Sequence, residues 1–120
     1  MTGPMPEEAL FELLSLECRI GSDGALLYYN SLGKLHRVHG PAVEWADGRH
    51  EWYQDGQLHR LDGPAVEYSD GRRTWWQNGQ RHRVDGPAVE YSNGYRAWYI
   101  NGDRLTEAAW QQAVASMGIV

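Results

Sequence analysis

The stretch His59-Arg-Leu-Asp-Gly-Pro-Ala-Val-Glu67 decides the fold, because the chain contains this pattern three times. The segments that start at His36 and His82 align with it without a gap, so equivalent residues lie 23 positions apart. Self-similarity at a fixed period of roughly 20 to 50 residues is typical of stacked arrays, in which each unit covers a face of its neighbour. The sequence therefore predicts an array of 23-residue units.

Two sets of turn-forming dipeptides recur with the same period. One set is Asp47-Gly48, Asp70-Gly71 and Asn93-Gly94, and the other is Asp55-Gly56, Asn78-Gly79 and Asn101-Gly102. Such pairs favour the two-residue type I′ turn, in which both residues have positive φ. We expect the first set to close one hairpin in each unit. The predicted fold is mainly β (α+β): a single-layer antiparallel meander of hairpins with a short helix at each end.

A two-residue turn fixes the register of each hairpin, and side chains along a strand alternate between two faces. One face is then expected to carry a core stripe of cross-strand pairs, which are Val43–Trp52, Val66–Trp75 and Val89–Trp98. The other face is expected to carry alanines, glutamates and a second aromatic row: Ala42, Ala65, Ala88, Glu44, Glu67, Glu90, Tyr53, Trp76 and Tyr99.

Both ends of the chain have helical patterns. Residues 6–17 begin with Pro6 and two glutamates and then place Leu10, Leu13 and Leu14 on one stripe. Residues 106–117 begin with Thr106, which is a good N-cap. We expect one domain over residues 1–120, with the hairpin repeats in 18–105. Because a single-layer sheet must cover its apolar face, at least one helix is expected to pack on the valine and tryptophan stripe.

Composition narrows the class of partner. The formal charge of −5 argues against general affinity for nucleic-acid backbone or anionic membrane, because both require a basic surface. Cys18 is the only cysteine, which excludes an internal disulfide and favours a reducing compartment. No apolar run approaches the roughly 20 residues of a membrane span. We expect a cytoplasmic protein, located in the host cytoplasm if its origin is viral.

The order Asn-Gly-x-x-His, strand, Asp-Gly, aromatic strand resembles the MORN repeat. The unit Asn-Gly-x-x-His-Arg-x-Asp-Gly-Pro-Ala-x-Glu is more similar to a MORN-like variant in uncharacterised proteins of bacteriophages and large DNA viruses. The resemblance covers residues 22–105, but Arg replaces the Gly after His, and two extra residues precede Pro-Ala-Val. It implies an elongated scaffold that binds other molecules, with membrane-lipid contact for some members, and it supplies no catalytic residues.

The repeated His/Asp pairs raise the question of a metal site. Equivalent positions in such an array lie two strands apart, roughly 9 to 10 Å, whereas zinc ligands lie about 2.0 to 2.3 Å from the ion. The ladder His36, His59 and His82 therefore cannot share one ion, and the pairs with Asp62 and Asp85 supply only two ligands each. We expect no metal or cofactor, and a structural role in which His or Asp satisfies loop backbone groups.

Three functional classes follow. The first is a non-enzymatic protein-binding module, in its viral form an inhibitor of a host defence complex. The second is a small metal-dependent hydrolase that uses the His/Asp pairs, and the third is a scaffold that contacts membrane lipid. For the first, the binding residues are expected on the face opposite the core stripe, with an open-edged sheet that permits a homodimer. The predicted site comprises Tyr53, Trp76, Tyr99, Arg60 and Arg83.

Overall fold

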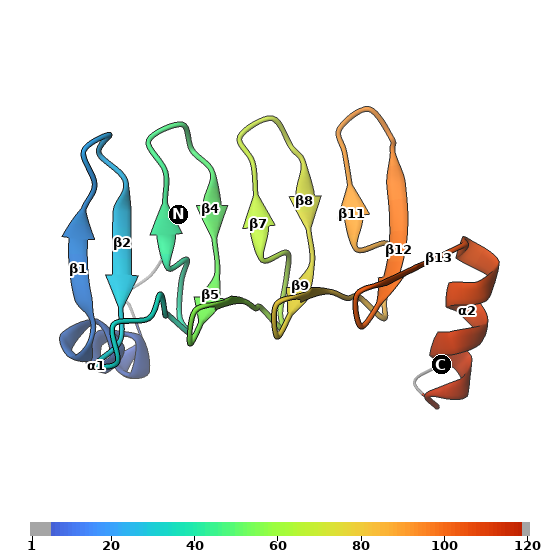
Figure 1. The fold of residues 1–120 in the computed structure, drawn as a ribbon, viewed down its shortest axis with the longest axis horizontal. Helices are drawn as coiled ribbons and strands as arrows, with labels where there is room; N and C mark the ends of the chain where they lie inside the picture. The colour runs from blue at the N-terminus through green and yellow to red at the C-terminus, as the bar shows by residue number, and fades with distance from the viewer. Residues whose placement is uncertain (1–5, 119–120) are drawn as a thin grey trace.

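The computed structural model describes residues 6–118; residues 1–5 and 119–120 of the predicted 1–120 domain lie outside the described part. The array is elongated, with extents of 44 × 30 × 30 Å, and its hairpins stand side by side along the long axis (Figure 1). A nine-stranded antiparallel sheet has the order β1-β2-β3-β4-β7-β8-β11-β12-β13. Two small hairpins, β5–β6 and β9–β10, accompany it. The predicted antiparallel meander with a helix at each end is thus confirmed.

The elements have these bounds: α1 (Glu7–Ser15), β1 (Glu17–Ile20), β2 (Leu26–Tyr29), β3 (Val43–Glu44), β4 (His50–Glu51), β5 (Tyr53–Gln54), β6 (Gln57–Leu58), β7 (Val66–Glu67), β8 (Arg73–Thr74), β9 (Trp76–Gln77), β10 (Gln80–Arg81), β11 (Val89–Glu90), β12 (Arg96–Ile100), β13 (Asp103–Leu105) and α2 (Glu107–Ser116). The first helix ends before the predicted residue 17, because Leu16 is extended and Glu17 pairs with Tyr29 in the sheet. Thr106 caps α2 as predicted, with its hydroxyl accepting from the Ala109 N–H at 3.1 Å.

Each central unit contains two hairpins with different turns. In the unit of β7 and β8, the Tyr68 N–H donates to the Arg72 carbonyl at 2.9 Å, so that Ser69, Asp70 and Gly71 form a three-residue loop. Only Gly71 of this loop has a positive φ, at 94°. The type I′ geometry instead occurs at Asn78-Gly79, where φ is 52° and 79°. The prediction of Asp-Gly hairpin loops was therefore right in place and wrong in turn type.

The longer loop shifts the register by one residue and corrects the predicted faces. Val66 pairs with Thr74 rather than with Trp75, and the same shift places Val43 opposite Glu51 and Val89 opposite Ala97. Because side chains alternate with a period of two, a one-residue slip moves every residue of the second strand to the other face. The predicted valine and tryptophan stripe was wrong: each valine lies on the face opposite its tryptophan.

We call the two sides the valine face and the loop face. The valine face carries Val43, Val66 and Val89 together with Tyr53, Trp76 and Tyr99. Contacts between residues two apart on one strand confirm this assignment, since the Trp76 indole N–H donates to the Thr74 hydroxyl at 2.8 Å. The loop face carries Trp52, Trp75, Trp98, Glu44, Glu67 and Glu90.

Both faces bury residues without a covering helix. The alanines Ala42, Ala65 and Ala88 are 0% exposed, and the proline before each of them accepts a hydrogen bond from the arginine of its own loop. On the valine face, where the valines are at most 5% exposed, long side chains of neighbouring strands stack on one another. The Arg49 guanidinium lies between the rings of Trp45 and Tyr68, at 4.7 and 5.7 Å from their centroids. The core is therefore a pair of thin layers, one on each side of a single sheet.

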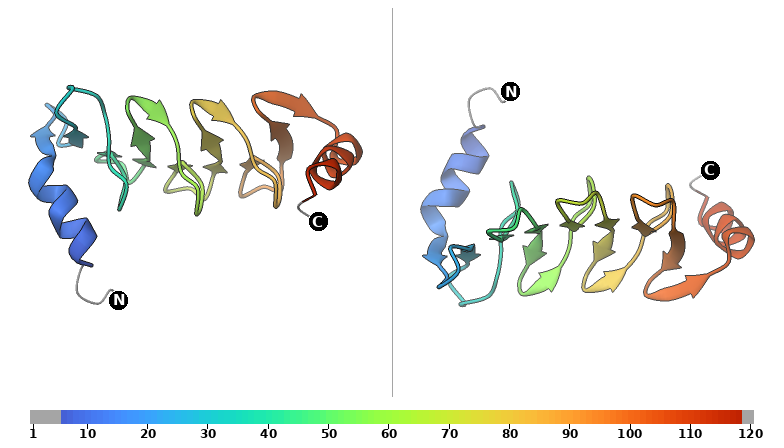
Figure 2. Two further views of the ribbon diagram at one scale, coloured as in Figure 1. Left: turned by 90° about the horizontal axis from the view of Figure 1, so that it is seen from below. Right: turned by 90° about the horizontal axis from the view of Figure 1, so that it is seen from above.

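Neither helix covers the middle of the sheet, contrary to the prediction: α2 closes the β13 end of the array, whereas α1 hydrogen-bonds to the first loop and leaves the β1 edge exposed. Helix α2 packs against β12 and β13 with Val114 only 2% exposed, whereas α1 buries Ala9 and leaves Leu10 and Leu14 exposed. Figure 2 shows the helices at opposite ends and reaching to the same side of the sheet. That side is the loop face, since α1 and α2 both hydrogen-bond to its loops, at Val38 and Arg83 respectively.

Candidate functional site

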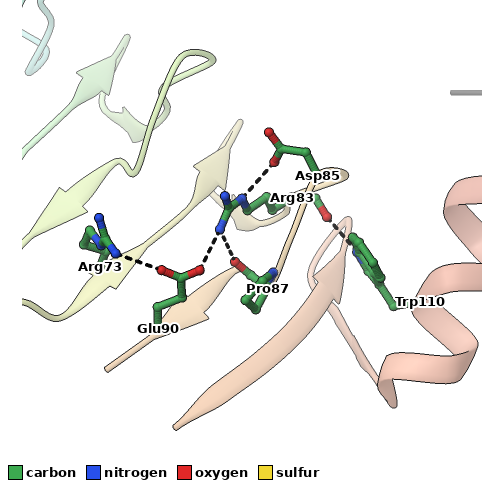
Figure 3. Close-up of polar contacts among 6 residues, drawn as sticks. All are labelled: Arg73, Arg83, Asp85, Pro87, Glu90 and Trp110. Atoms are coloured by element: carbon green, nitrogen blue, oxygen red, sulfur yellow. Dashed lines mark hydrogen bonds and ion pairs between the residues drawn. The ribbon is translucent and has the colours of Figure 1, made fainter. Parts of the chain in front are cut away.

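An arginine anchors each loop onto the sheet. The Arg83 Nη1 donates to the Pro87 carbonyl at 3.0 Å and to Glu90 at 3.1 Å, while its Nε donates to Asp85 at 2.8 Å (Figure 3). Its Cζ also lies 3.7 Å from the ring centroid of Trp75. One guanidinium thus joins the two ends of the loop, the glutamate of the next strand and an aromatic ring of the preceding strand.

A similar arrangement occurs in the two preceding units, although His39 replaces the aspartate in the first of them and the buried Arg37 Nε finds no partner within residues 6–118. Arg60 donates to the Pro64 carbonyl at 3.0 Å and lies 3.8 Å from the Trp52 centroid, and Arg37 lies 4.4 Å from the Tyr28 centroid. The glycine of each Asp-Gly-Pro segment makes room for this arginine, because a Cβ on Gly63 would stand 2.9 Å from the Arg60 Cζ. The arginine column therefore holds the loops, and a role as a freely solvated charge does not describe it.

The repeated histidines also hold the backbone. The Nδ1 atoms of His36, His59 and His82 accept hydrogen bonds of 2.9 to 3.0 Å from the N–H groups of Asp55, Asn78 and Asn101 respectively. Each donor is the first residue of a type I′ turn, whose strained positive φ is thereby supported. This confirms the prediction that the histidine satisfies a loop backbone group. The hydrogen bond leaves Nε2 as the ring nitrogen that is free to donate.

We expect this bond to make stability depend on pH. Burial lowers the pKa of His82 from its ordinary value of 6.5, so the unfolded chain binds a proton more tightly than the folded chain does. The stability contributed by neutral His82 is complete above pH 6.5 and is lost as pH falls from there through the lower folded pKa. In urea titrations across this range, His82→Gln should reduce the dependence on pH. Identical pH profiles for variant and wild type would contradict this assignment.

Two equivalent clefts separate successive loops on the loop face. The first is lined by Val38, His39, Trp52, Gln54, His59, Arg60, Leu61 and Asp62. Every one of these residues has a counterpart 23 positions later that lines the second cleft, from Leu61 to Asp85. Their volumes of about 290 and 340 Å³ accommodate a few side chains. The repeat thus generates a periodic row of small concave sites with a tryptophan in each.

Helix α2 lies beside the last loop, where the next unit would otherwise stand. Its Trp110 indole N–H donates to the Arg83 carbonyl at 2.8 Å (Figure 3). Trp110 and Val114 line a recess together with Val84, the apolar residue at the x position of the His-Arg-x-Asp-Gly-Pro loop. The corresponding residue of the middle loop, Leu61, is 75% exposed. An apolar helix face therefore covers one loop of the array and leaves its central counterpart open.

The predicted site residues do not form one surface. Tyr53, Trp76 and Tyr99 lie half-buried on the valine face, whereas Arg60 and Arg83 lie on the loop face. The aromatic row also packs on its own neighbours, since Arg81 Cζ lies 5.2 and 5.4 Å from the Trp76 and Tyr99 centroids. Burial, the largest cause, together with the Glu51 carboxylate raises the pKa of Tyr53 to about 12.

Sequence reasoning missed the apolar x position of the loops, occupied by Val38, Leu61 and Val84. The signal was present, since all three units place an aliphatic residue between the arginine and the Asp or His of a polar loop. Leu61 and Val38 are 75% and 49% exposed, so most of each side chain is left uncovered by its own loop. At the last loop, the residue in this position lines a recess together with Trp110 and Val114 of α2.

Within residues 6–118, no group of three or more His, Cys, Asp and Glu side chains has an arrangement that holds a metal ion. In the same part of the chain, no helix has the length and apolar character needed to cross a membrane. Comparison of the chain with protein families, curated proteins and solved structures finds no match. The loop face, with its row of clefts, is therefore identified as the candidate functional site from its geometry alone.

Proposed function

We propose that the protein is a protein-binding repeat module whose partner docks on the loop face. The observation that supports this most directly is the seating of α2 against the last loop, through the Trp110 hydrogen bond to Arg83 and the burial of Val114. The chain thereby demonstrates that this type of loop accepts an apolar helix face. The middle loop offers the equivalent groups, the Arg60 carbonyl and the Leu61 side chain, to a second molecule.

The middle loop has the chemistry of a docking point. Leu61 is 75% exposed and lies at the boundary between the two clefts, where it lines both. The Arg60 carbonyl corresponds to the carbonyl that receives Trp110, and within residues 6–118 it accepts no hydrogen bond. An incoming aliphatic side chain that covers Leu61 and an incoming N–H donor would reproduce the α2 contacts.

Charge adds a requirement on the partner. Asp62 and Asp85 stand at the rims of the clefts with side chains 87% and 81% exposed. Their arginine partners are already engaged with the loop backbone and the sheet, so these carboxylates retain open sides toward solvent. A partner with Lys or Arg next to its apolar contact residues would match this rim, in keeping with the net charge of −5.

The resemblance to MORN-like viral repeats suggests a more specific form of the proposal, in which the partner belongs to a host defence complex that the module inhibits. Small size and acidity are compatible with that role. The lipid-scaffold and hydrolase alternatives gain less support from the geometry. Against the hydrolase, the Nδ1 atoms of the repeated histidines already accept backbone hydrogen bonds. Against the lipid scaffold, the loop face presents carboxylates, whereas binding to an anionic membrane surface requires cationic side chains.

The test compares the two faces. A photo-crosslinking amino acid at position 61 should capture a partner, after which calorimetry measures its affinity for Leu61→Asp, for Trp76→Ala and for the unmodified chain. We expect Leu61→Asp to weaken binding by more than about 2 kcal/mol, because it places a charge in the apolar contact. Trp76→Ala, on the opposite face, should bind normally if folded. The reverse result, with Trp76 essential and Leu61 dispensable, would assign binding to the valine face instead.

A further inference from the structure

The two edges of the nine-stranded sheet differ. Strand β13 at one edge contacts α2, whereas β1 forms the other edge and all four of its residues are exposed (Figure 1). We propose that β1 pairs with β1 of a second copy of this chain, antiparallel and with the two-fold axis at Cys18. The sheets of two molecules would then be continuous. This surface is separate from the loop clefts and does not depend on the proposed function.

The hydrogen bonds of β2 identify which backbone groups of β1 are open. The Tyr28 N–H donates to Ala42 and the Tyr28 carbonyl accepts from His36, so both groups of Tyr28 point away from β1. Backbone groups alternate in direction along a strand, and Cys18 is the residue paired with Tyr28. The N–H and C=O groups of Cys18 and Ile20 therefore point outward, where they present an unpaired edge to another strand.

Charge selects the register among the regular antiparallel alternatives. In each of them an outward residue must pair with an outward residue. With Cys18 on the axis, Glu17 of each copy faces Arg19 of the other, which gives two pairs of opposite charge. A shift of the axis to Arg19 would instead place two arginines opposite each other, and an axis at Ile20 would leave Arg19 opposite Gly21. Only the first register is complementary in charge.

The side chains on the two faces of β1 suit this register. Glu17 and Arg19 are each 59% exposed and already bond to each other at 2.9 Å, so a facing pair extends the same network. On the opposite face, Ile20 is 74% exposed and would lie across from Leu16 of the other copy. The hydrogen-bonded pair of Cys18 residues would have a Cα–Cα distance of about 5.5 Å, which is within the range of a disulfide.

The experiment measures the oligomeric state of the full chain by sedimentation equilibrium. We expect a dimer at micromolar concentration. Arg19→Glu and Glu17→Arg should each raise its dissociation constant by roughly tenfold or more, because each single change makes both facing pairs like-charged. The double variant Glu17→Arg/Arg19→Glu should restore the dimer, since opposite charges face each other again. This rescue separates pairing between copies from damage to the fold of one strand.

Oxidation supplies an independent reading of the register. Because Cys18 is the single cysteine, every covalent dimer formed under mild oxidation joins Cys18 to Cys18. We expect rapid cross-linking in the wild type and the double variant, and slow cross-linking in either single variant. A monomer at all concentrations would overturn the proposal. A dimer that ignores both charge reversals, or in which Cys18 does not cross-link, would overturn the register at Cys18.

Discussion

Replacement of Trp52 by alanine is expected to lower the free energy of unfolding by about 3 to 5 kcal/mol. Trp52 is 9% exposed although it belongs to a single-layer sheet. The Arg60 guanidinium covers one side of its ring at 3.8 Å, and the His50 ring approaches edge-on at 6.3 Å. Truncation removes the ring that this part of the loop face is packed on and leaves the arginine over a cavity. Urea unfolding with an unchanged m-value would measure the loss.

Trp98 provides a matched control, because it holds the same repeat position as Trp52 two units later. The arginine that would cover it is replaced by Thr106, and its ring is only half-buried. Trp98→Ala should therefore destabilise the protein clearly less than Trp52→Ala. Equal losses of unfolding free energy at the two positions would mean that the arginine that covers Trp52 adds nothing to the stability that its ring provides.

The sequence predicted the architecture because its strongest signals are local. The Asp-Gly and Asn-Gly turns and the Thr106 cap each depend on a few neighbouring residues, and the 23-residue period repeats the turns along the chain. The register was wrong because Asp-Gly is compatible with two loops. It can form a two-residue type I′ turn, or it can end a three-residue loop in which only Gly has positive φ. Residues Asp70 and Gly71 adopt the second form.

That one-residue error propagated to the candidate site. A register with Val66 opposite Trp75 puts Trp76 on the same side as Ala65 and so predicts that Trp76 is an uncovered binding anchor. In the structure, the ring on the loop face of this strand is Trp75, and Arg83 covers it. The stacking of an arginine on a tryptophan eight residues earlier depends on how the loop folds back. No local pattern encodes this, whereas the histidine bond to a turn backbone could be predicted.

The loops also explain how so thin a protein remains ordered. Each unit contributes one His-Arg-x-Asp-Gly-Pro segment. Its histidine accepts a hydrogen bond from the type I′ turn that follows it in the chain, as His82 does from Asn101, and its arginine fixes the loop over the sheet. The sheet therefore acquires a second layer from its own connections instead of from a helix. The terminal helices are left free to lie beside the loops, α2 at the last loop and α1 at the first loop and the recess that it lines with Trp52 and Arg60.

Arg83→Ala is expected to lower the free energy of unfolding by about 2 to 3 kcal/mol, because it removes charge-assisted hydrogen bonds from a side chain that is 19% exposed. The Pro87 carbonyl and the Glu90 carboxylate each lose a donor, and Trp75 loses its cover. The Trp110 bond uses the backbone of residue 83, so α2 should stay docked. Urea unfolding measures the loss, and circular dichroism monitors the helix.

Two further variants distinguish the anchored guanidinium from a simple positive charge. Arg73 bonds to the same Glu90 at 3.0 Å, yet it is 53% exposed and has no loop to hold, so Arg73→Ala should cost under about 1 kcal/mol. Arg83→Lys keeps the charge but lacks the planar fork that reaches a carbonyl and two carboxylates while stacking on a ring. It should remain nearly as unstable as Arg83→Ala. Full stability in the lysine variant would show that charge alone holds the loop.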